Sequence, residues 1–326
     1  MNQATAQAPV NIALVKYWGK RDDSLNLPMN NSISMALDNA YTTTTVTFGS
    51  GMIQDTFILN DVPQNSVETA KVSLVLNLVR SLAQISWRAA VISHNTWPTA
   101  AGLASSASGF AALAAAATKA LNLDVSLSEL SSLARRGSGS ACRSVYGGFV
   151  EWAKGVARDG HDSYVFPLPV KNDWPLRLVT PLSGTFHPKA VSSREGMQRA
   201  VSSSPLYASW LTTVADDLGK VRRALLDGNL KILGTAMEGN AFKMHATTMS
   251  ALPPVIYWQP LTLTLMEVVL RLREEGVPAF MTLDAGPHLM VLTELSFVER
   301  VREQFEHVSG VDHIVVSAPG PGVRWL

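Results

Sequence analysis

The chain has 326 residues, of which 47% are hydrophobic and 16% charged, so it is long enough for about two globular domains and too apolar for a disordered protein. Its 27 lysines and arginines against 26 acidic residues leave a net charge of +1, which provides no general field for binding nucleic acid or an anionic membrane. A single cysteine, Cys142, excludes an internal disulfide and is typical of a reducing compartment. We therefore expect a cytoplasmic protein that binds any anionic ligand through local groups.

Two strands, a helix and a further strand are predicted in the first part of the chain. The β-branched residues over 10–15 and 42–48 favour strands, because branching at Cβ suits an extended backbone. A helix is expected over 67–83 and a short strand over 89–93. No basic leader followed by an apolar run opens the chain, so we expect no signal peptide.

A glycine-rich turn and two helices come next. The segment PTAAGLASSASG (98–109) runs into an Ala-rich helix, whose weakly apolar residues favour a buried helix over a membrane span. Ser126 and Glu129 have the spacing of a capping box, so a second helix begins there and ends at Gly137. The loop SGSACRS follows, and 148–152 has the pattern of a strand.

The second half of the chain has longer helical patterns. One apolar stripe at helical spacing covers 211–225, and another covers 261–272. Strands are predicted over 279–283, 289–292 and 313–317, the last of them after one more helix. Because helices and strands alternate irregularly in both halves, the pattern favours an α+β or mixed α/β fold.

Two domains are predicted, one over 1–174 and the other over 175–326. We place their boundary at Trp174–Pro175, where the rhythm of the sequence changes.

The segment 98–109 has the composition of an anion site. Small residues let the backbone approach a ligand, and the first N–H groups of a helix carry partial positive charge and lack intrahelical partners. Ser105 and Ser106 add hydroxyls suited to phosphate oxygens or a magnesium ion. The segment is neither a Walker loop nor a Rossmann fingerprint. The alternative is that its small residues only allow the helix to pack tightly.

The segment RRGSGSACRS (135–144) places three guanidinium groups around two glycines. Arg135 and Arg136 are expected to form an ordinary solvated end of the preceding helix, where the macrodipole favours cations. Arg143 lies beyond the glycines among small residues, and its planar fork suits a carboxylate or phosphate ligand. Cys142 is expected to be a packed residue and not a nucleophile.

Two further segments carry candidate chemistry. In NIALVKYWGKRD, Lys16, Tyr17 and Lys20 follow a strand, where they form either a solvated loop or a clamp for a diphosphate. In LDAGPH, Asp284 stands where a strand stops, so it either sets a turn or accepts a hydroxyl proton in a phosphate-binding cleft. The seven histidines form no zinc motif, and we assign His161 and His245 no role.

Taken together, these segments resemble the diphosphomevalonate decarboxylase family of the GHMP kinase superfamily. The resemblance covers nearly the whole chain in order and also includes LNLPMNNSIS, DGHDS, SSREGM and FKMHATT. PTAAGLASSAS marks the superfamily, whereas KYWGKRD together with GSGSACRS marks the family.

The resemblance implies a fold, a reaction and partners. The fold is a two-domain GHMP kinase fold, with an N-terminal domain like domain 2 of ribosomal protein S5, a C-terminal ferredoxin-like half and the active site between them. The reaction uses ATP and Mg²⁺ to convert mevalonate 5-diphosphate to isopentenyl diphosphate, ADP, phosphate and CO₂ in the mevalonate pathway of isoprenoid biosynthesis. A homodimer is also implied, with no nucleic-acid or membrane partner.

The resemblance also implies the roles of particular residues. Asp284 matches the catalytic aspartate that takes the C3 hydroxyl proton, Arg143 the arginine that holds the substrate carboxylate, and Lys16 a lysine close to the reacting centre. Asn11 matches an asparagine that supports Arg143, and Ser106 matches a serine that contacts phosphate and counts as catalytic. The ATP-binding loop comprises Pro98, Ala101, Gly102, Ala104, Ser105 and Ser106. The residues that bind the 5-diphosphate or its neighbours are Tyr17, Lys20, Ser138, Gly139, Ser140 and Ser192.

Some positions depart from the family pattern. His288 stands where the family prefers asparagine, and Met29 and Asn31 replace smaller hydroxylated residues. No counterpart is found for the glutamate that binds magnesium in other superfamily kinases, so the metal ligands are not assigned.

Three alternatives stay open. A mevalonate 5-monophosphate decarboxylase is disfavoured by Lys20, Tyr17 and Ser192, because a second phosphate needs added donors. Arg143 and the KYWGK segment argue against a small-molecule kinase that does not decarboxylate. Retention of both Asp284 and Arg143 argues against a silent ATP-binding protein.

Overall fold

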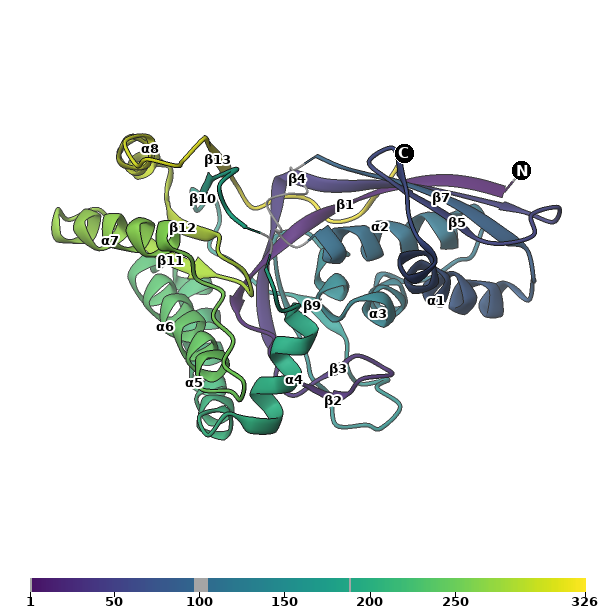
Figure 1. Ribbon diagram of the computed structural model, residues 1–326, viewed down its shortest axis with the longest axis horizontal. Coiled ribbons are helices and arrows are strands. Elements are labelled where there is room, and N and C mark those ends of the chain that lie inside the picture. The colour runs from purple at the N-terminus through teal and green to yellow at the C-terminus, as the bar shows by residue number, and fades with distance from the viewer. Residues whose placement is uncertain (1, 97–104, 188) are drawn as a thin grey trace.

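Two β-sheets with helices packed on them make up the computed structural model, which describes residues 2–96, 105–187 and 189–326 (Figure 1). In spatial order, the path of the larger sheet runs through β14 (Arg324–Trp325), β1 (Asn2–Val15), β4 (Ser32–Gly49), β7 (Arg88–Asn95), β5 (Thr56–Leu59) and β6 (Val62–Pro63). Two further strands, β8 (Phe149–Trp152) and β9 (Val165–Pro167), join this sheet through β4. A separate hairpin consists of β2 (Lys20–Asp22) and β3 (Leu27–Pro28).

The long antiparallel pair of β1 and β4 runs from the larger sheet to the second half of the molecule (Figure 1). Burial alternates along residues 40–49 of β4, as expected for strands with one covered face. By contrast, residues 8–15 of β1 and 32–37 of β4 are buried without alternation, because both faces are covered there. The register shifts between Pro9 and Asn11 and between Ala13 and Val15. Such bulges re-aim side chains, and here they precede residues that reach the site described below.

Three helices pack on the larger sheet. They are α1 (Ser66–Ala83), α2 (Ser105–Ala120) and α3 (Leu127–Gly137). Residues 111–117 of α2 are all buried and all but one are alanines, so the helix backbone approaches β1 and β4 closely. Ser126 caps α3, and its side chain and that of Glu129 form the predicted capping box.

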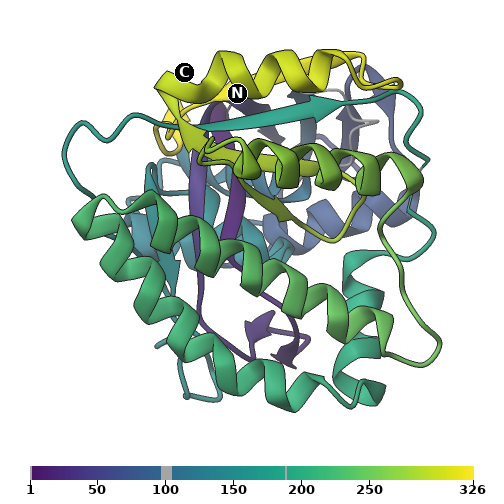
Figure 2. The same cartoon turned by 90° about the vertical axis from the view of Figure 1, so that its left-hand side faces the viewer.

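The second half of the chain forms the smaller sheet and most of the remaining helices (Figure 2). Its strands, in spatial order, are β11 (Phe280–Leu283), β12 (Leu289–Glu294), β10 (Leu176–Leu182) and β13 (His313–Ser317). Its helices are α4 (Ser193–Ser203), α5 (Tyr207–Asp227), α6 (Leu230–Met249), α7 (Pro260–Glu274) and α8 (Val298–Glu306), with the 3₁₀ turn η3 (Leu295–Phe297) after β12. The 3₁₀ turn η2 (Gly139–Ser144) belongs to the first half, between α3 and β8.

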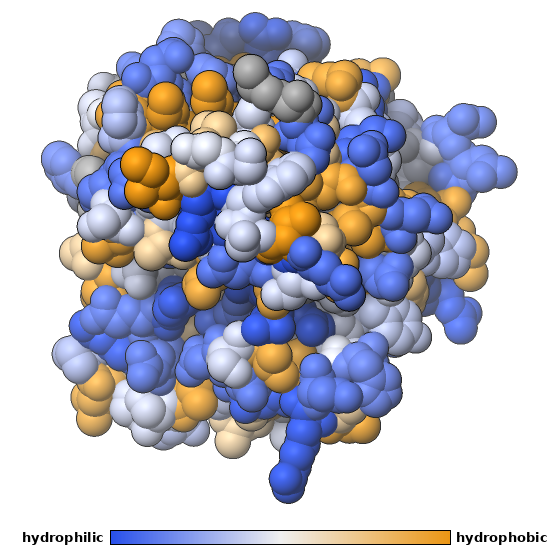
Figure 3. Space-filling view, turned by 90° about the vertical axis from the view of Figure 1, so that its right-hand side faces the viewer, coloured by the Kyte–Doolittle hydropathy of each residue, from blue (hydrophilic) through white to orange (hydrophobic). Residues whose placement is uncertain are grey.

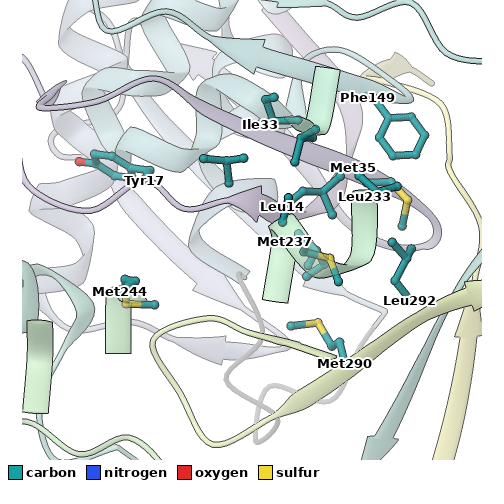
Figure 4. Packing of buried hydrophobic residues seen from close by; sticks show 14 of the residues in the cluster. Leu14, Tyr17, Ile33, Met35, Phe149, Leu233, Met237, Met244, Met290 and Leu292 are labelled. Atoms are coloured by element: carbon teal, nitrogen blue, oxygen red, sulfur yellow. The ribbon is translucent and has the colours of Figure 1, made fainter. Parts of the chain in front are cut away.

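One apolar core joins the two sheets. Figure 4 shows Leu14, Ile33 and Met35 of the long strand pair beside Met237 of α6 and Leu292 of β12. These five side chains are fully buried and belong to a single cluster. Because interiors are close-packed, this shared core fixes how the strand pair meets α6.

The surface is of mixed polarity, and among the described helices none is long and apolar enough to cross a bilayer. At the end of the molecule where β5, β7 and α1 lie, apolar residues form small groups between hydrophilic ones (Figure 3). This is the usual surface of a globular protein.

The elements predicted from the sequence are confirmed, although β1 and β4 extend beyond the predicted ranges. The expectation for Arg135 is wrong. Its side chain is buried, and its guanidinium donates to the carbonyl oxygens of Gly160 and Ser163, so it braces the loop after β8 and is not a solvated helix end. The domain boundary at Trp174–Pro175 stays a prediction. It falls between β9 and β10, while the terminal β14 returns to the larger sheet.

Candidate active site

A cavity of about 540 Å³ opens between the two halves. The predicted residues that line it come from β1 and the loop after it, β2, α2, η2 and the residue before it, the start of α4 and the loop after β11. They are Asn11, Lys16, Tyr17, Lys20, Ser106, Ser138, Gly139, Ser140, Arg143, Ser192 and Asp284. Pro98, Ala101, Gly102 and Ala104 lie outside the described residues, and of Ser105 only its place at the start of α2 is described.

The charge of this cavity is strongly unbalanced. Among the described residues that line it, six are cationic and only Asp284 is acidic. The six are Lys16, Lys20, Lys71, Arg143, Lys189 and Arg194. In a chain of net charge +1, this concentration is local, and it suits a ligand with several negative charges.

Lys16 and Asp284 both line the cavity and contact each other there, although 268 positions separate them. The Lys16 Nζ lies 2.7 Å from Asp284 Oδ1 and donates a second bond of 2.8 Å to the carbonyl of Ala13. Burial lowers the pKa of Lys16, whereas the charge of Asp284 acts in the opposite direction. Asp284 keeps about a third of its side chain accessible, so its carboxylate faces both the lysine and the cavity.

Arg143 is held from two sides by β1 and β4. Its Nε donates to Asn11 Oδ1 at 3.2 Å, and its Nη1 donates to Ser32 Oγ at 2.6 Å. Asn11 is fixed in turn by Ser144 Oγ at 2.7 Å. Arg143 is only 3% exposed, and no carboxylate of the described residues forms an ion pair with it. A buried guanidinium without an acidic partner is costly, so the site suits an anion that enters the cavity.

Tyr17 and Lys20 lie at another part of the cavity wall. The Tyr17 hydroxyl is buried with no partner in the described part of the chain, and its ring packs on Trp152 with centroids 4.8 Å apart. Burial raises the pKa of Tyr17, so the phenol stays protonated and can donate to a ligand oxygen. Lys20 Nζ donates to Asn26 Oδ1 at 2.7 Å, and burial lowers its pKa.

The serines contribute hydroxyls and helix ends. Ser192 caps α4, with its Oγ accepting from the backbone N–H of Glu195 at 3.2 Å, so the positive end of this helix faces the cavity. Gly139 lies so close to Tyr17 that a Cβ there would come within 2.7 Å of the phenol oxygen. Glycine is therefore needed for this close approach, with Ser138 and Ser140 on either side.

A second pocket of about 170 Å³ adjoins the first and shares Lys71, Ser106 and Phe110 with it. Its walls are largely apolar. They include Phe57, Leu59, Val72, Val91 and Leu113. The Asn95 amide nitrogen is buried in this wall without a partner among the described residues, while its Oδ1 accepts from Thr42. We call this the base pocket, because a largely apolar pocket with an unpartnered amide donor in its wall suits a heteroaromatic ring.

Sequence reasoning missed several lining residues. Lys71 belongs to α1 and has the pattern of ordinary helix surface, whereas Arg194 belongs to α4, a helix that the sequence did not predict. Arg194 does lie in the segment SSREGM, which carried the resemblance without a role for it. Lys189 donates to the carbonyl of Ala285 at 3.2 Å, and burial lowers its pKa.

His288, whose role was open, also lines the cavity. Its ring packs edge-on against Phe186 with centroids 4.6 Å apart, and burial lowers its pKa to about 4. Cys142 is buried beside the site, and burial raises the pKa of its thiol to about 12, as expected of a packed residue. Among the described residues, no group of three or more His, Cys, Asp or Glu side chains is placed to hold a metal ion.

Comparison with known proteins gives a match over both halves of the chain. Residues 8–165 match the diphosphomevalonate decarboxylase-like N-terminal domain, and residues 185–318 match the mevalonate 5-diphosphate decarboxylase C-terminal domain. The diphosphomevalonate decarboxylase of Saccharomyces cerevisiae is 38% identical over 311 residues, which cover 88% of this chain and 77% of the relative.

Solved structures are similar over almost the full length. The mevalonate diphosphate decarboxylase from Enterococcus faecalis has a TM-score of 0.92 and 45% identity, covering 99% of this chain and 98% of its own. The Staphylococcus aureus enzyme has a TM-score of 0.94 and 40% identity at the same coverage. A structure of MDDEF in complex with MVAPP, AMPPCP and magnesium also has a TM-score of 0.94, with 45% identity and the same coverage.

The fold and the cationic cavity define a two-domain protein of the GHMP-kinase type, which confirms the predicted α+β class. Within that class, the chain belongs to the diphosphomevalonate decarboxylase family. The resemblance inferred from its motifs is thereby confirmed.

Proposed function

We propose that this protein catalyses the ATP-dependent decarboxylation of mevalonate 5-diphosphate to isopentenyl diphosphate, releasing ADP, phosphate and CO₂. The observation that carries the proposal is the buried Arg143, which has no acidic partner among the described residues and lines the same cavity as Asp284. A substrate with a carboxylate at one point and a hydroxyl at another satisfies both groups at once.

The first step is phosphorylation of the C3 hydroxyl, because a tertiary alcohol is a poor leaving group. Asp284 orients this hydroxyl and takes its proton as the oxygen attacks the terminal phosphorus of ATP, which breaks the bond to ADP. Lys16 places a positive charge beside Asp284 and the transferred group. Most of the acceleration then comes from positioning and from neutralising charge.

The second step is loss of the new phosphate together with CO₂. As the C3–O bond breaks, positive charge develops at C3, and the electron pair of the C–CO₂ bond moves to form the double bond. Arg143, supported by Asn11, fixes the carboxylate in place. Since pairing with Arg143 stabilises the ground state too, the departure of phosphate drives the step.

We assign the remaining groups by the charge they face. Tyr17, Lys20, Ser138, Gly139, Ser140 and Ser192 bind the 5-diphosphate region, with Arg194 added from the geometry. Ser106, at the start of α2, contacts the ATP phosphates, and the base pocket holds the adenine.

Magnesium fits this site only as a partner of the phosphates. Because no cage of acidic ligands exists among the described residues, the ion would be held mainly by phosphate oxygens and water, as Mg²⁺ often is. Ser106, at the start of α2 in the cavity lining, would be the side-chain oxygen that adds to this coordination. When bound, the ion supplies charge neutralisation on the polyphosphate.

A direct assay distinguishes this proposal from its competitors. The protein is incubated with magnesium-ATP and mevalonate 5-diphosphate, ADP and CO₂ are followed together, and the 5-monophosphate is run alongside. Equal ADP and CO₂ from the diphosphate are expected. ADP without CO₂ would indicate a kinase, turnover of the monophosphate alone would change the substrate, and no turnover of either would indicate a silent nucleotide-binding protein.

The base pocket gives a prediction of its own. Asn95→Leu removes a buried amide donor that has no partner among the described residues, so we expect the KM for ATP to rise about tenfold, as for one lost hydrogen bond of about 1.4 kcal/mol. Turnover at saturating ATP and the KM for mevalonate 5-diphosphate should stay unchanged. Steady-state kinetics with each substrate varied in turn measures this split, and an unchanged KM for ATP would place the adenine elsewhere.

We also propose that the protein works in the cytoplasm as a homodimer. A lone buried cysteine supports the reducing compartment, and the family resemblance supports the dimer. Sedimentation of the pure protein across a concentration series tests the dimer.

A further inference from the structure

The Lys16 backbone is held by side-chain amides on both sides. Lys16 is the first residue after β1, where the strand ladder has ended. Its N–H donates to Asn240 Oδ1 at 2.8 Å, and its carbonyl accepts from Asn30 Nδ2 at 2.8 Å. Both asparagines are buried. A buried backbone N–H outside a strand ladder needs a hydrogen-bond acceptor, and Asn240 Oδ1 is the acceptor for the Lys16 N–H.

Asn240 comes from the other half of the molecule. It lies on α6, 224 positions after Lys16, and its side chain is fully buried. No assigned role in binding or chemistry includes it, and it does not line the cavity. Its contact with Lys16 joins the strand end that bears the lysine to the helices behind the smaller sheet.

Asp217 fixes which way the Asn240 amide faces. Asn240 Nδ2 donates to Asp217 Oδ2 at 2.7 Å. An ionised carboxylate only accepts hydrogen bonds, so the NH₂ end of the amide must face Asp217 and the oxygen must face Lys16. Lys243 Nζ, 2.5 Å from the same carboxylate oxygen, supplies the balancing charge.

The chain of contacts therefore ends at the catalytic pair. Asp217 orients Asn240, Asn240 holds the Lys16 N–H, and the Lys16 ammonium reaches Asp284 at 2.7 Å. Lys16 has no freedom to compensate for a shifted backbone, because its side chain is 3% exposed and Nζ is also bound to Ala13. A small movement of the peptide becomes a movement of the ammonium.

We propose that Asn240, clamped by Asp217, is a positioning residue that sets the Lys16 backbone and so fixes the Lys16 ammonium against Asp284. The inference rests on the proposed role of the Lys16–Asp284 pair in phosphoryl transfer. It predicts an effect on turnover and not on substrate capture, because the hydrogen bonds of Asn240 among the described residues go to Lys16 and Asp217 and not to the groups that bind diphosphate and carboxylate.

The test compares Asn240→Ala with the control Thr248→Val. Thr248 is also fully buried on α6, and its hydroxyl donates to the carbonyl of His245 instead of reaching Lys16. We expect Asn240→Ala to lower kcat about 10- to 100-fold, the scale of a misplacement near 1 Å, with both KM values within about threefold of wild type. Thr248→Val should keep the wild-type kcat. Equal loss of kcat in both variants, or an unchanged kcat in Asn240→Ala, would overturn the inference.

A double-mutant cycle with Lys16→Met separates positioning from general damage. If Asn240 acts through Lys16, the double variant should have a single-turnover rate less than about threefold below that of Lys16→Met alone. The full 10- to 100-fold loss in that background would contradict the inference while leaving the role of Lys16 intact. A Lys16→Met variant with wild-type turnover would instead remove the role proposed for the pair.

A second variant serves if Asn240→Ala does not fold. Asp217→Asn keeps the volume of the side chain but no longer dictates the orientation of the Asn240 amide. We expect a loss of kcat in the same direction, about 3- to 10-fold, again without a matching change in KM. A wild-type kcat in Asp217→Asn would show that the clamp does not set the lysine.

Discussion

Replacing Asp284 with alanine should lower kcat by about three to four powers of ten, the scale of a lost general base together with its orienting contact. Asp284 is the only acidic residue found in the described lining of the cavity, so no neighbouring carboxylate can take the C3 hydroxyl proton in its place. ATP binding should change little, because the base pocket and the α2 terminus do not involve Asp284. Single-turnover formation of ADP, beside equilibrium binding of the nucleotide, measures both quantities.

A second variant separates the base from the charge pair. Asp284→Ala also leaves the Lys16 ammonium buried with only Ala13 as a partner, and loss of the carboxylate lowers the pKa of Lys16 further. Asp284→Asn keeps an oxygen near Lys16 but cannot accept the proton. Both variants should lose turnover to a similar extent if proton transfer dominates. Wild-type turnover in either one would remove Asp284 from the role of base.

The local sequence was sufficient to predict the helices and strands that have one buried face. The stripes in α5 and α7 and the capping box of α3 carry their structure in the spacing of a few residues. By contrast, α6 went unpredicted because it is buried on several faces, so its buried positions make no single stripe. The short α4 is mostly polar, and its beginning is marked by little more than Ser192.

Some residues of the site could likewise be predicted from the sequence, and others could not. The motif residues could be identified from the chain because their types and spacing resemble a family, and the structure brings the described ones into one cavity. The sequence could not identify Lys71, Asn95 and Arg194 as site residues, because only the packing of helices and strands places them against the cavity or the base pocket. For Arg135 the sequence predicted a solvated side chain, and this prediction was wrong. A basic helix end is usually solvated, and only the fold of the loop at 155–163 buries this one.

Replacing Arg143 with glutamine should raise the KM for mevalonate 5-diphosphate and lower kcat together. Glutamine can keep one contact with Asn11 or Ser32 but loses both the charge and the planar fork that suits a carboxylate. A lost charge-assisted bond of about 1.5–3 kcal/mol corresponds to roughly 10- to 100-fold in KM. A misplaced carboxylate should lower kcat by a further factor of about ten or more. Arg143→Lys, which keeps the charge without the fork, should fall between.

The same substitution should leave the free protein as stable as wild type, or more stable. In the absence of substrate, Arg143 is a buried cation with only neutral partners among the described residues, and such a charge is costly. Substrate removes that cost in the wild type, so mevalonate 5-diphosphate should raise the Tm of wild type much more than that of Arg143→Gln. Thermal unfolding with and without the ligand measures both effects. A large loss of stability in the ligand-free variant, with ligand stabilisation retained, would mean that Arg143 serves the fold and not the carboxylate.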